Sequence, residues 1–245
     1  MAAANFDPQH LDNKYHFLLR KLHSLTGIVP VGLFLIEHML TNSRAFHWWG
    51  LFQSGPQQFN DGVHFLHSLP FLPFLEIFGI FLPLAFHAIY GVVIWLTGRS
   101  NVTAYPHADN WRYTLQRISG IVVFLFVILH LLKFRFAHWI GWGKEFMDHE
   151  LADKFEITRN GLMAWSPGGE GGAAVAAWIT LSIYWIGLTA ACFHFANGIW
   201  GFCISWGITI GKQAQRRMGV LAAFVGLVLF AWGSLGLYAF ATAPG

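Results

Sequence analysis

The chain consists of long apolar runs separated by shorter polar connections. A lipid bilayer core requires about 17–25 apolar residues in helical form. Neither strand-length alternation nor the frequent turns of a barrel accompany the runs. The pattern therefore predicts an all-α integral membrane protein, a single membrane domain with five transmembrane helices. The predicted helices cover about Leu25–Asn42, Phe71–Thr97, Ile118–Ile140, Ala174–Trp206 and Gly219–Thr242.

Composition supports this class and excludes several others. The chain is 55% hydrophobic and 11% charged, against about 25% charged residues in an ordinary soluble domain. The polar segment before Leu25 has no apolar core followed by a small-residue cleavage site, so we expect the first helix to be retained. The net charge of +3 does not point to nucleic acid. No C-x-x-C-H motif is present in the sequence, which argues against that route of covalent haem attachment.

Basic residues alternate between the two predicted sides of the membrane. They gather before the first helix, between the second and third, and between the fourth and fifth, whereas the connection over residues 141–173 is mostly acidic. The positive-inside rule then predicts a cytoplasmic N-terminus, an outer C-terminus and an outer surface loop at 141–173. The cations on the predicted inner side are Lys14, Arg20, Lys21, Arg99, Arg112, Arg117, Lys212, Arg216 and Arg217.

Four of the thirteen histidines lie deep in apolar runs, one on each of the first four predicted helices. They are His38, His87, His130 and His194. A single buried histidine is equally well explained by a hydrogen bond between helices. Four of them on successive helices match two haems with two axial imidazoles each, held in a four-helix core.

The depth of each histidine predicts how the four are paired. His38 and His130 lie three to six residues from a charged residue at the outer end of their runs. His87 and His194 lie seventeen or more residues from the outer starts of theirs. We therefore expect His38 and His130 to hold an outer haem iron, and His87 and His194 to hold an inner one.

Small residues near the inner histidines suggest a large flat ligand. Gly91 and Gly198 each follow a histidine by four residues, so they share its helix face. They leave room either for haem or for close contact between helices. The first and third helices also begin alike, with LHSLTGI at 22–28 and LQRISGI at 115–121, which indicates an old two-helix repeat.

Two carboxylic acids also lie inside apolar runs. Glu76 lies on the same helix face as His87, about three turns further outward, which places it near the expected outer haem. An acid there could exchange protons at a quinone site. The alternative is a structural acid that bonds to a neighbour, and this alternative applies more to Glu37 than to Glu76.

Four segments carry a family resemblance: RKLHSLTGIVPVGLFLIEHML, SLPFLPFLEIFGIFLPLAFHAIYGV, LQRISGIVVFLFVILH and FHFANGIWGFCISWGITI. They resemble the cytochrome b anchor subunits of bacterial succinate dehydrogenases, in the single-chain, five-helix, dihaem class that includes quinol–fumarate reductase anchors. The resemblance extends from about Lys14 to Arg217.

The resemblance implies a place in an electron-transfer complex of the bacterial cytoplasmic (inner) membrane. A flavoprotein and an iron–sulfur subunit would bind the cytoplasmic face. Electrons would pass through the inner and then the outer haem b to a quinone, usually menaquinone in this class. The four buried histidines match ligand positions, while His23, Ser24 and Arg117 match positions near the inner haem propionates.

Other functions remain open on the sequence. The chain could anchor a fumarate reductase, a hydrogenase or a formate dehydrogenase, since the soluble partners determine the direction of electron flow. A haem carrier is a further alternative, but it favours exposed ligands over four buried ones. Because no nucleophile, phosphate loop or flavin motif is visible, we expect the isolated chain to catalyse no substrate chemistry.

Overall fold

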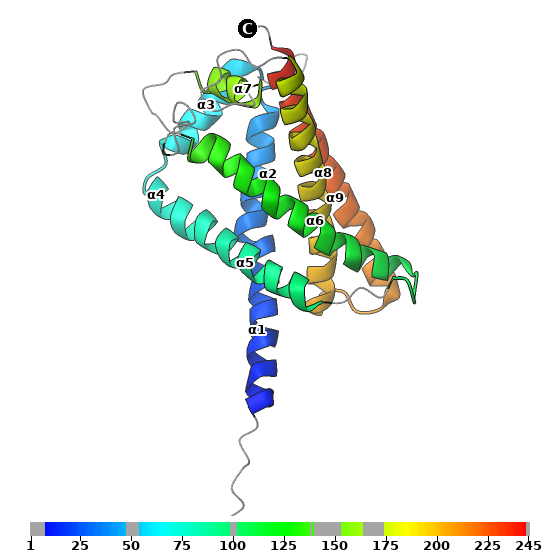
Figure 1. The fold of residues 1–245 in the computed structure, drawn as a ribbon. Helices are drawn as coiled ribbons and strands as arrows, with labels where there is room; N and C mark the ends of the chain where they lie inside the picture. The colour runs from blue at the N-terminus through cyan, green and yellow to red at the C-terminus, as the bar shows by residue number, and fades with distance from the viewer. Residues whose placement is uncertain are drawn as a thin grey trace, which may run out of the picture.

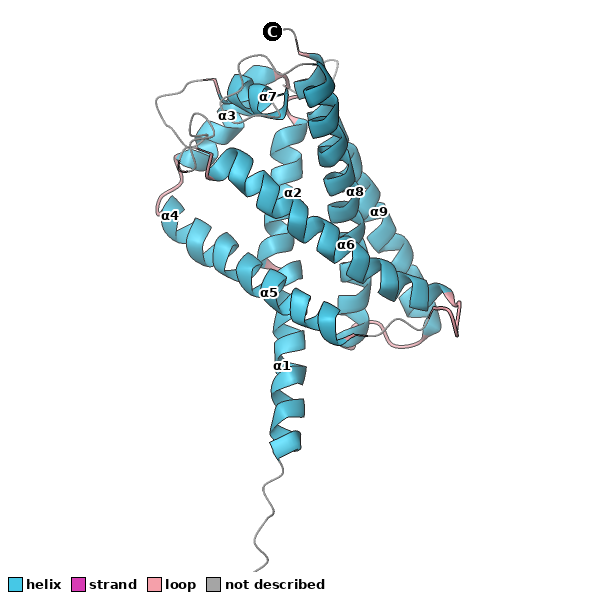
Figure 2. Cartoon of the chain, viewed as in Figure 1, coloured by secondary structure: helices cyan, strands magenta, loops and turns pink. Residues whose placement is uncertain are grey.

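The computed structural model describes residues 8–47, 54–98, 102–137, 139, 153–163 and 174–243, and over these residues the fold is helical (Figure 2). Five helical stretches are long and apolar enough to cross a membrane. The predicted class, an all-α membrane protein with five transmembrane helices, is thereby confirmed. The spans are Tyr15–Ser43, Leu72–Thr97, Ala108–Arg135, Ala177–Ser205 and Lys212–Thr242.

The first span begins earlier than the apolar run that predicted it. Helices α1 (Pro8–Ile28) and α2 (Pro30–Ser43) meet at Val29, whose amide still bonds to the Leu25 carbonyl at 2.9 Å. The first half of α1 projects beyond the other helices (Figure 1). Counting a continuous apolar run misses this part, because charged residues interrupt it while the helix continues.

The second and third spans each contain a π-helical stretch. The second comprises α4 (Leu72–Phe74), η1 (Leu75–Phe81) and α5 (Leu82–Thr97). The third comprises α6 (Ala108–His130) and η2 (Leu131–Arg135). In η1 the Leu82 amide bonds to the carbonyl of Ile77, five residues back. Pro83, which has no amide hydrogen, follows directly.

The fourth and fifth spans are the long helices α8 (Ala174–Ser205) and α9 (Lys212–Thr242). They lie side by side, and α9 also packs against α2 (Figure 1). Helix α9 turns small residues such as Gly226 and Gly233 inward, so it approaches its neighbours closely. It begins at Lys212 instead of the predicted Gly219, because the intervening Lys, Gln and Arg residues are good helix formers.

Two shorter helices cover the end of the bundle at which α9 ends (Figure 1). Helix α3 (Pro56–His67) and helix α7 (Lys154–Met163) are joined through Asn60, whose Oδ1 accepts from the Phe155 amide at 2.7 Å. The predicted outer loop thus contains a helix that the sequence did not indicate. Its remaining residues, 141–152 and 164–173, lie outside the described residues, as do Arg99 and the side chain of Lys14.

Candidate functional site

The four histidines that the sequence predicts as ligands come together as two pairs of rings. His38 on α2 and His130 at the end of α6 have ring centroids 5.8 Å apart and ring planes at 80°. His87 on α5 and His194 on α8 have centroids 6.2 Å apart and planes at 86°. These are the two pairs that the depth of each histidine predicted.

The spacing within each pair fits two imidazoles that share one metal atom. With a metal–nitrogen bond of about 2 Å and about 1.1 Å from nitrogen to ring centre, the two centroids would be roughly 6 Å apart. Among the described residues, no three His, Cys, Asp or Glu side chains converge as a metal site. Two imidazoles alone leave a metal ion short of ligands. Haem requires only two from the protein, so the donor sets fit haem.

The two pairs lie at different depths of the bundle. The hydroxyl of Tyr184 on α8 lies 3.4 Å from His130 Nδ1, which marks the level of the outer pair on that helix. His194 follows ten residues later on the same helix, a rise of about 15 Å. Two separate sites, each with a pair of rings, therefore follow one another along the bundle.

Backbone carbonyls on neighbouring helices hold the inner rings. His87 Nδ1 lies 2.8 Å from the carbonyl oxygen of His23, and His194 Nδ1 lies 3.1 Å from that of Gln116. A ring that donates from Nδ1 to a carbonyl leaves Nε2 free to bind a metal. The Gln116 amide nitrogen lies 3.4 Å from His194 Nε2 and donates to the His194 carbonyl at 3.1 Å.

One comparison with known proteins identifies the family of the chain. The chain is 38% identical over 214 residues to the succinate dehydrogenase cytochrome b558 subunit of Bacillus subtilis (strain 168), and the match covers 87% of this chain and 90% of that protein. The chain belongs to the succinate dehydrogenase cytochrome b subunit family. The predicted resemblance is thereby confirmed. No protein-family model matches the chain, and no solved structure matches it.

The glycines predicted beside the ligands face other residues in this cytochrome b family chain. A Cβ atom on Gly91 would lie 3.2 Å from Cε1 of His23, and one on Gly198 would lie 3.6 Å from Nε2 of Gln116. The glycines that face the inner rings themselves are Gly27 and Gly120. Sequence reasoning missed these two and Gln116, although all three lie in the repeated segments at 22–28 and 115–121.

Of the three residues expected near the inner propionates, two retain unused donors. The His23 ring stacks on His87 with centroids 4.0 Å apart. Arg117 donates from Nη2 to the carbonyls of Trp95 and Gly98 at the end of α5. His23 Nδ1 and Arg117 Nε are buried and have no hydrogen-bond partner within the described part of the chain. Carboxylates placed there would satisfy these atoms, which fits haem propionates.

Ser24 is already engaged with other residues. Its hydroxyl donates to the Lys21 carbonyl at 2.9 Å and accepts from Trp206 Nε1 at 3.0 Å. The second bond joins α1 to Trp206, directly after the end of α8. The contacts of Ser24 are therefore those of a residue that ties two helices together at this end of the bundle.

Glu76 forms an ion pair near the level of the outer histidines. Its Oε2 lies 3.1 Å from Arg135 Nη2, and the two side chains are 17% and 25% exposed. Glu76 lies in η1, and Arg135 ends η2, five residues beyond His130. π-Helical turns frequently occur at functional sites. By contrast, Glu37 accepts a 2.6 Å bond from Thr41 one turn away, which agrees with a structural acid.

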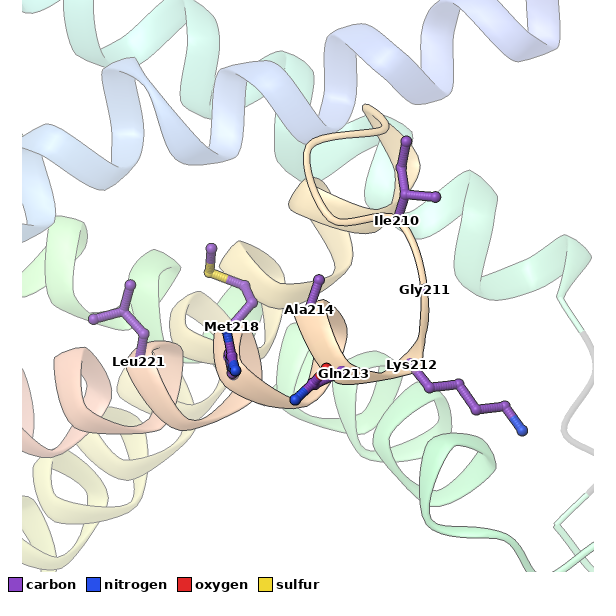
Figure 3. Close-up of a pocket in the computed structure, with 8 residues that line it drawn as sticks. Ile210, Gly211, Lys212, Gln213, Ala214, Met218 and Leu221 are labelled. Atoms are coloured by element: carbon purple, nitrogen blue, oxygen red, sulfur yellow. The ribbon is translucent and has the colours of Figure 1, made fainter.

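An open hollow of about 560 Å³ lies at the connection between α8 and α9 (Figure 3). Its lining combines Lys212, Gln213 and Arg217 with the apolar Met218 and Leu221. The two cations belong to the set predicted to face the cytoplasm. None of the four buried histidines lines the hollow, so it is separate from both pairs.

Proposed function

We propose that the chain is the dihaem cytochrome b anchor subunit of a succinate dehydrogenase in a bacterial cytoplasmic membrane. His38 and His130 hold the outer haem, and His87 and His194 hold the inner haem. The observation that carries the proposal is the occurrence of two ring pairs, each at the spacing of two imidazoles on one metal atom. Haem b supplies one-electron transfer when it is bound.

The surrounding residues orient the ligands and neutralise charge. The carbonyls of His23 and Gln116 fix the inner rings through Nδ1, which raises the basicity of each ligand. The unused donors of His23 and Arg117 would bind the propionates of the inner haem. At the outer pair, the rings of Phe126, Phe134 and Tyr184 lie around His130.

We assign the orientation of the chain in the membrane from the charge distribution. The end of the bundle at which α9 begins carries Lys212, Arg216 and Arg217, so the positive-inside rule places it in the cytoplasm. The flavoprotein and iron–sulfur subunits bind this face, and the C-terminus lies outside. The chain then passes electrons from the iron–sulfur subunit through the inner and then the outer haem to a quinone, which we assign as menaquinone.

Glu76 and Arg135 are the residues that we connect to quinone chemistry. Reduction of a quinone to a quinol takes up protons as well as electrons, so a protonatable side chain is needed near the outer haem. Glu76 lies at that level and is less than one-fifth exposed. Arg135 holds it in one position through their ion pair.

The test is purification of the intact complex, with haem counted against this chain and the copurified subunits identified. The proposal predicts two haems b per chain, together with a subunit that carries covalent flavin and another that carries iron–sulfur clusters. A ratio of zero or one haem in folded protein would contradict the dihaem assignment. A nickel or molybdenum subunit would instead assign the anchor to a hydrogenase or a formate dehydrogenase.

A further inference from the structure

Two helix pairs hold the inner histidines in the same way. His87 on α5 contacts the carbonyl of His23 on α1, and His194 on α8 contacts the carbonyl of Gln116 on α6. In the segments LHSLTGI and LQRISGI, residues 23 and 116 occupy the same position. Each inner ligand is therefore anchored to the equivalent carbonyl of its neighbouring helix.

The equivalence extends to one glycine in each segment, at positions 27 and 120. A Cβ atom on Gly27 would lie 2.7 Å from Nδ1 of His87 and still closer to Cε1. On Gly120 a Cβ atom would lie 3.0 Å from Cε1 and 3.4 Å from Nδ1 of His194. Each glycine thus lies directly against the ring of an inner ligand.

The ligand helices repeat as well. FHAIYGV at 86–92 and FHFANGI at 193–199 place Gly91 and Gly198 at one position. These glycines face residues 23 and 116 on the neighbouring helix. A Cβ atom added to Gly91 would lie 3.2 Å from the His23 ring, and one added to Gly198 would lie 3.6 Å from the Gln116 amide nitrogen. The α1–α5 and α6–α8 pairs are therefore two copies of one unit, and the α1–α5 copy is the tighter of the two.

The His87 ring cannot swing away from an added methyl group without loss. Its Nδ1 is bonded to the His23 carbonyl, and its face stacks on the His23 ring at 4.0 Å. Any rotation that relieves contact with position 27 lengthens the hydrogen bond or breaks the stack. Because that bond fixes the orientation of the ring, the position of Nε2 depends on the absence of a side chain at Gly27.

We propose that Gly27 and Gly120 are positioning residues for the inner haem. Each lets a ligand ring lie against its neighbouring helix with Nδ1 on a carbonyl, which aims the two Nε2 atoms at each other. The inference rests on the proposed dihaem function. It adds a graded order of sensitivity, with Gly27 most sensitive, then Gly120, then Gly91 and finally Gly198.

The test is a series of glycine-to-alanine variants, each purified in the intact complex. Inner-haem occupancy is read from the haem-to-chain ratio and the reduced-minus-oxidised spectrum. Gly27→Ala should lower the occupancy by about tenfold or more, since overpacking on this scale shifts equilibria by that amount. Gly120→Ala should lower it less, and Gly198→Ala should keep two haems. Normal inner-haem occupancy in Gly27→Ala would overturn the proposal.

Two other glycines, Gly201 on α8 and Gly79 in η1, provide controls. A Cβ atom on Gly79 or Gly201 would meet no described residue within 4 Å apart from its own stretch of helix, so alanine there meets open space. Gly79→Ala and Gly201→Ala should keep both haems, because alanine is the better helix former. Loss of the inner haem in both controls to the extent seen in Gly27→Ala would overturn the steric account.

A double variant separates ligand positioning from general helix packing. In the His87→Ala background the ring is gone, so adding Gly27→Ala should leave the outer haem and the yield of complex unchanged. A further loss in the double variant would overturn the positioning role. The failure of the dihaem function looks different, because the unmodified complex would then contain fewer than two haems.

Discussion

The inner histidine pair is anchored to backbone atoms, whereas the outer pair is enclosed by aromatic side chains. Both inner rings contact a carbonyl oxygen within 3.1 Å. In the outer pair, Nδ1 of His130 lies 3.4 Å from the hydroxyl oxygen of Tyr184. The ring of Phe34 lies beside the ring of His38. The inner site therefore depends on glycines, which have no side chain and let the rings reach backbone atoms. The outer site depends on which side chains fill the space around it.

The two sites also differ in the charges close to them. On the side of the inner pair, His23 Nδ1 and Arg117 Nε are buried and have no hydrogen-bond partner among the described residues. Near the outer pair, Glu76 and Arg135 form an ion pair. This difference agrees with haem propionates near the inner pair and with proton exchange with a quinone near the outer pair. Four substitutions test it, in order of expected effect.

Loss of the acid near the outer pair should have the largest effect. Glu76→Gln should lower the rate of quinone reduction by about a hundredfold, the scale of a lost proton donor or acceptor. Both haems should remain bound and reducible by succinate. Glu37→Gln is the matched control, because Glu37 bonds to Thr41 within its own helix. An unchanged quinone rate in Glu76→Gln would remove it from the quinone site.

Loss of the contact between α3 and α7 should destabilise the outer end of the bundle. Asn60→Ala leaves the buried Phe155 amide without its acceptor and removes the bond to Asp153, which costs about 1–3 kcal/mol. The thermal unfolding midpoint should fall, and the inner-haem spectrum should stay the same. Gln57→Ala removes an exposed bond within α3 and should change neither. Selective loss of the inner haem in Asn60→Ala would contradict this separation.

Arg117→Gln should lower the midpoint potential of the inner haem. A positive charge disfavours the oxidised iron, so its removal favours that form, by up to about 60 mV for a tenfold change in the equilibrium. The outer potential should not move. Arg112→Gln removes the same charge from the same helix, but Arg112 stacks on Trp200 and faces Gly219. Equal shifts in both variants would indicate a general charge effect instead.

The smallest effect is expected from Tyr184→Phe. The hydroxyl contact with His130 Nδ1 is long, so its loss should raise the outer midpoint potential by less than about 60 mV. The direction follows because an imidazole without its Nδ1 partner is a weaker base and favours oxidised iron less. A redox titration of the haem bands measures the shift. A larger shift in the inner haem would contradict the assignment of Tyr184 to the outer level.

The sequence predicts the number of spans and the pairing of the histidines, because both depend on position along an apolar run. It does not predict η1, η2 or α7, since a π-helical turn and a helix within a polar connection depend on packing against other segments. We interpreted Gly91 and Gly198 only from the helix face that each shares with a ligand histidine four residues earlier. The side chains that they face, those of His23 and Gln116, belong to α1 and α6, which the pattern of a single helix does not reveal.

The most direct measurement of the two-site account is the reduced-minus-oxidised spectrum of the complex in four single variants. His87→Ala and His194→Ala should lose the same haem band and keep the other. His38→Ala and His130→Ala should lose the band that the first two retain. If the bands are lost in any other grouping, such as one band shared by His38→Ala and His87→Ala, the two-pair arrangement is wrong.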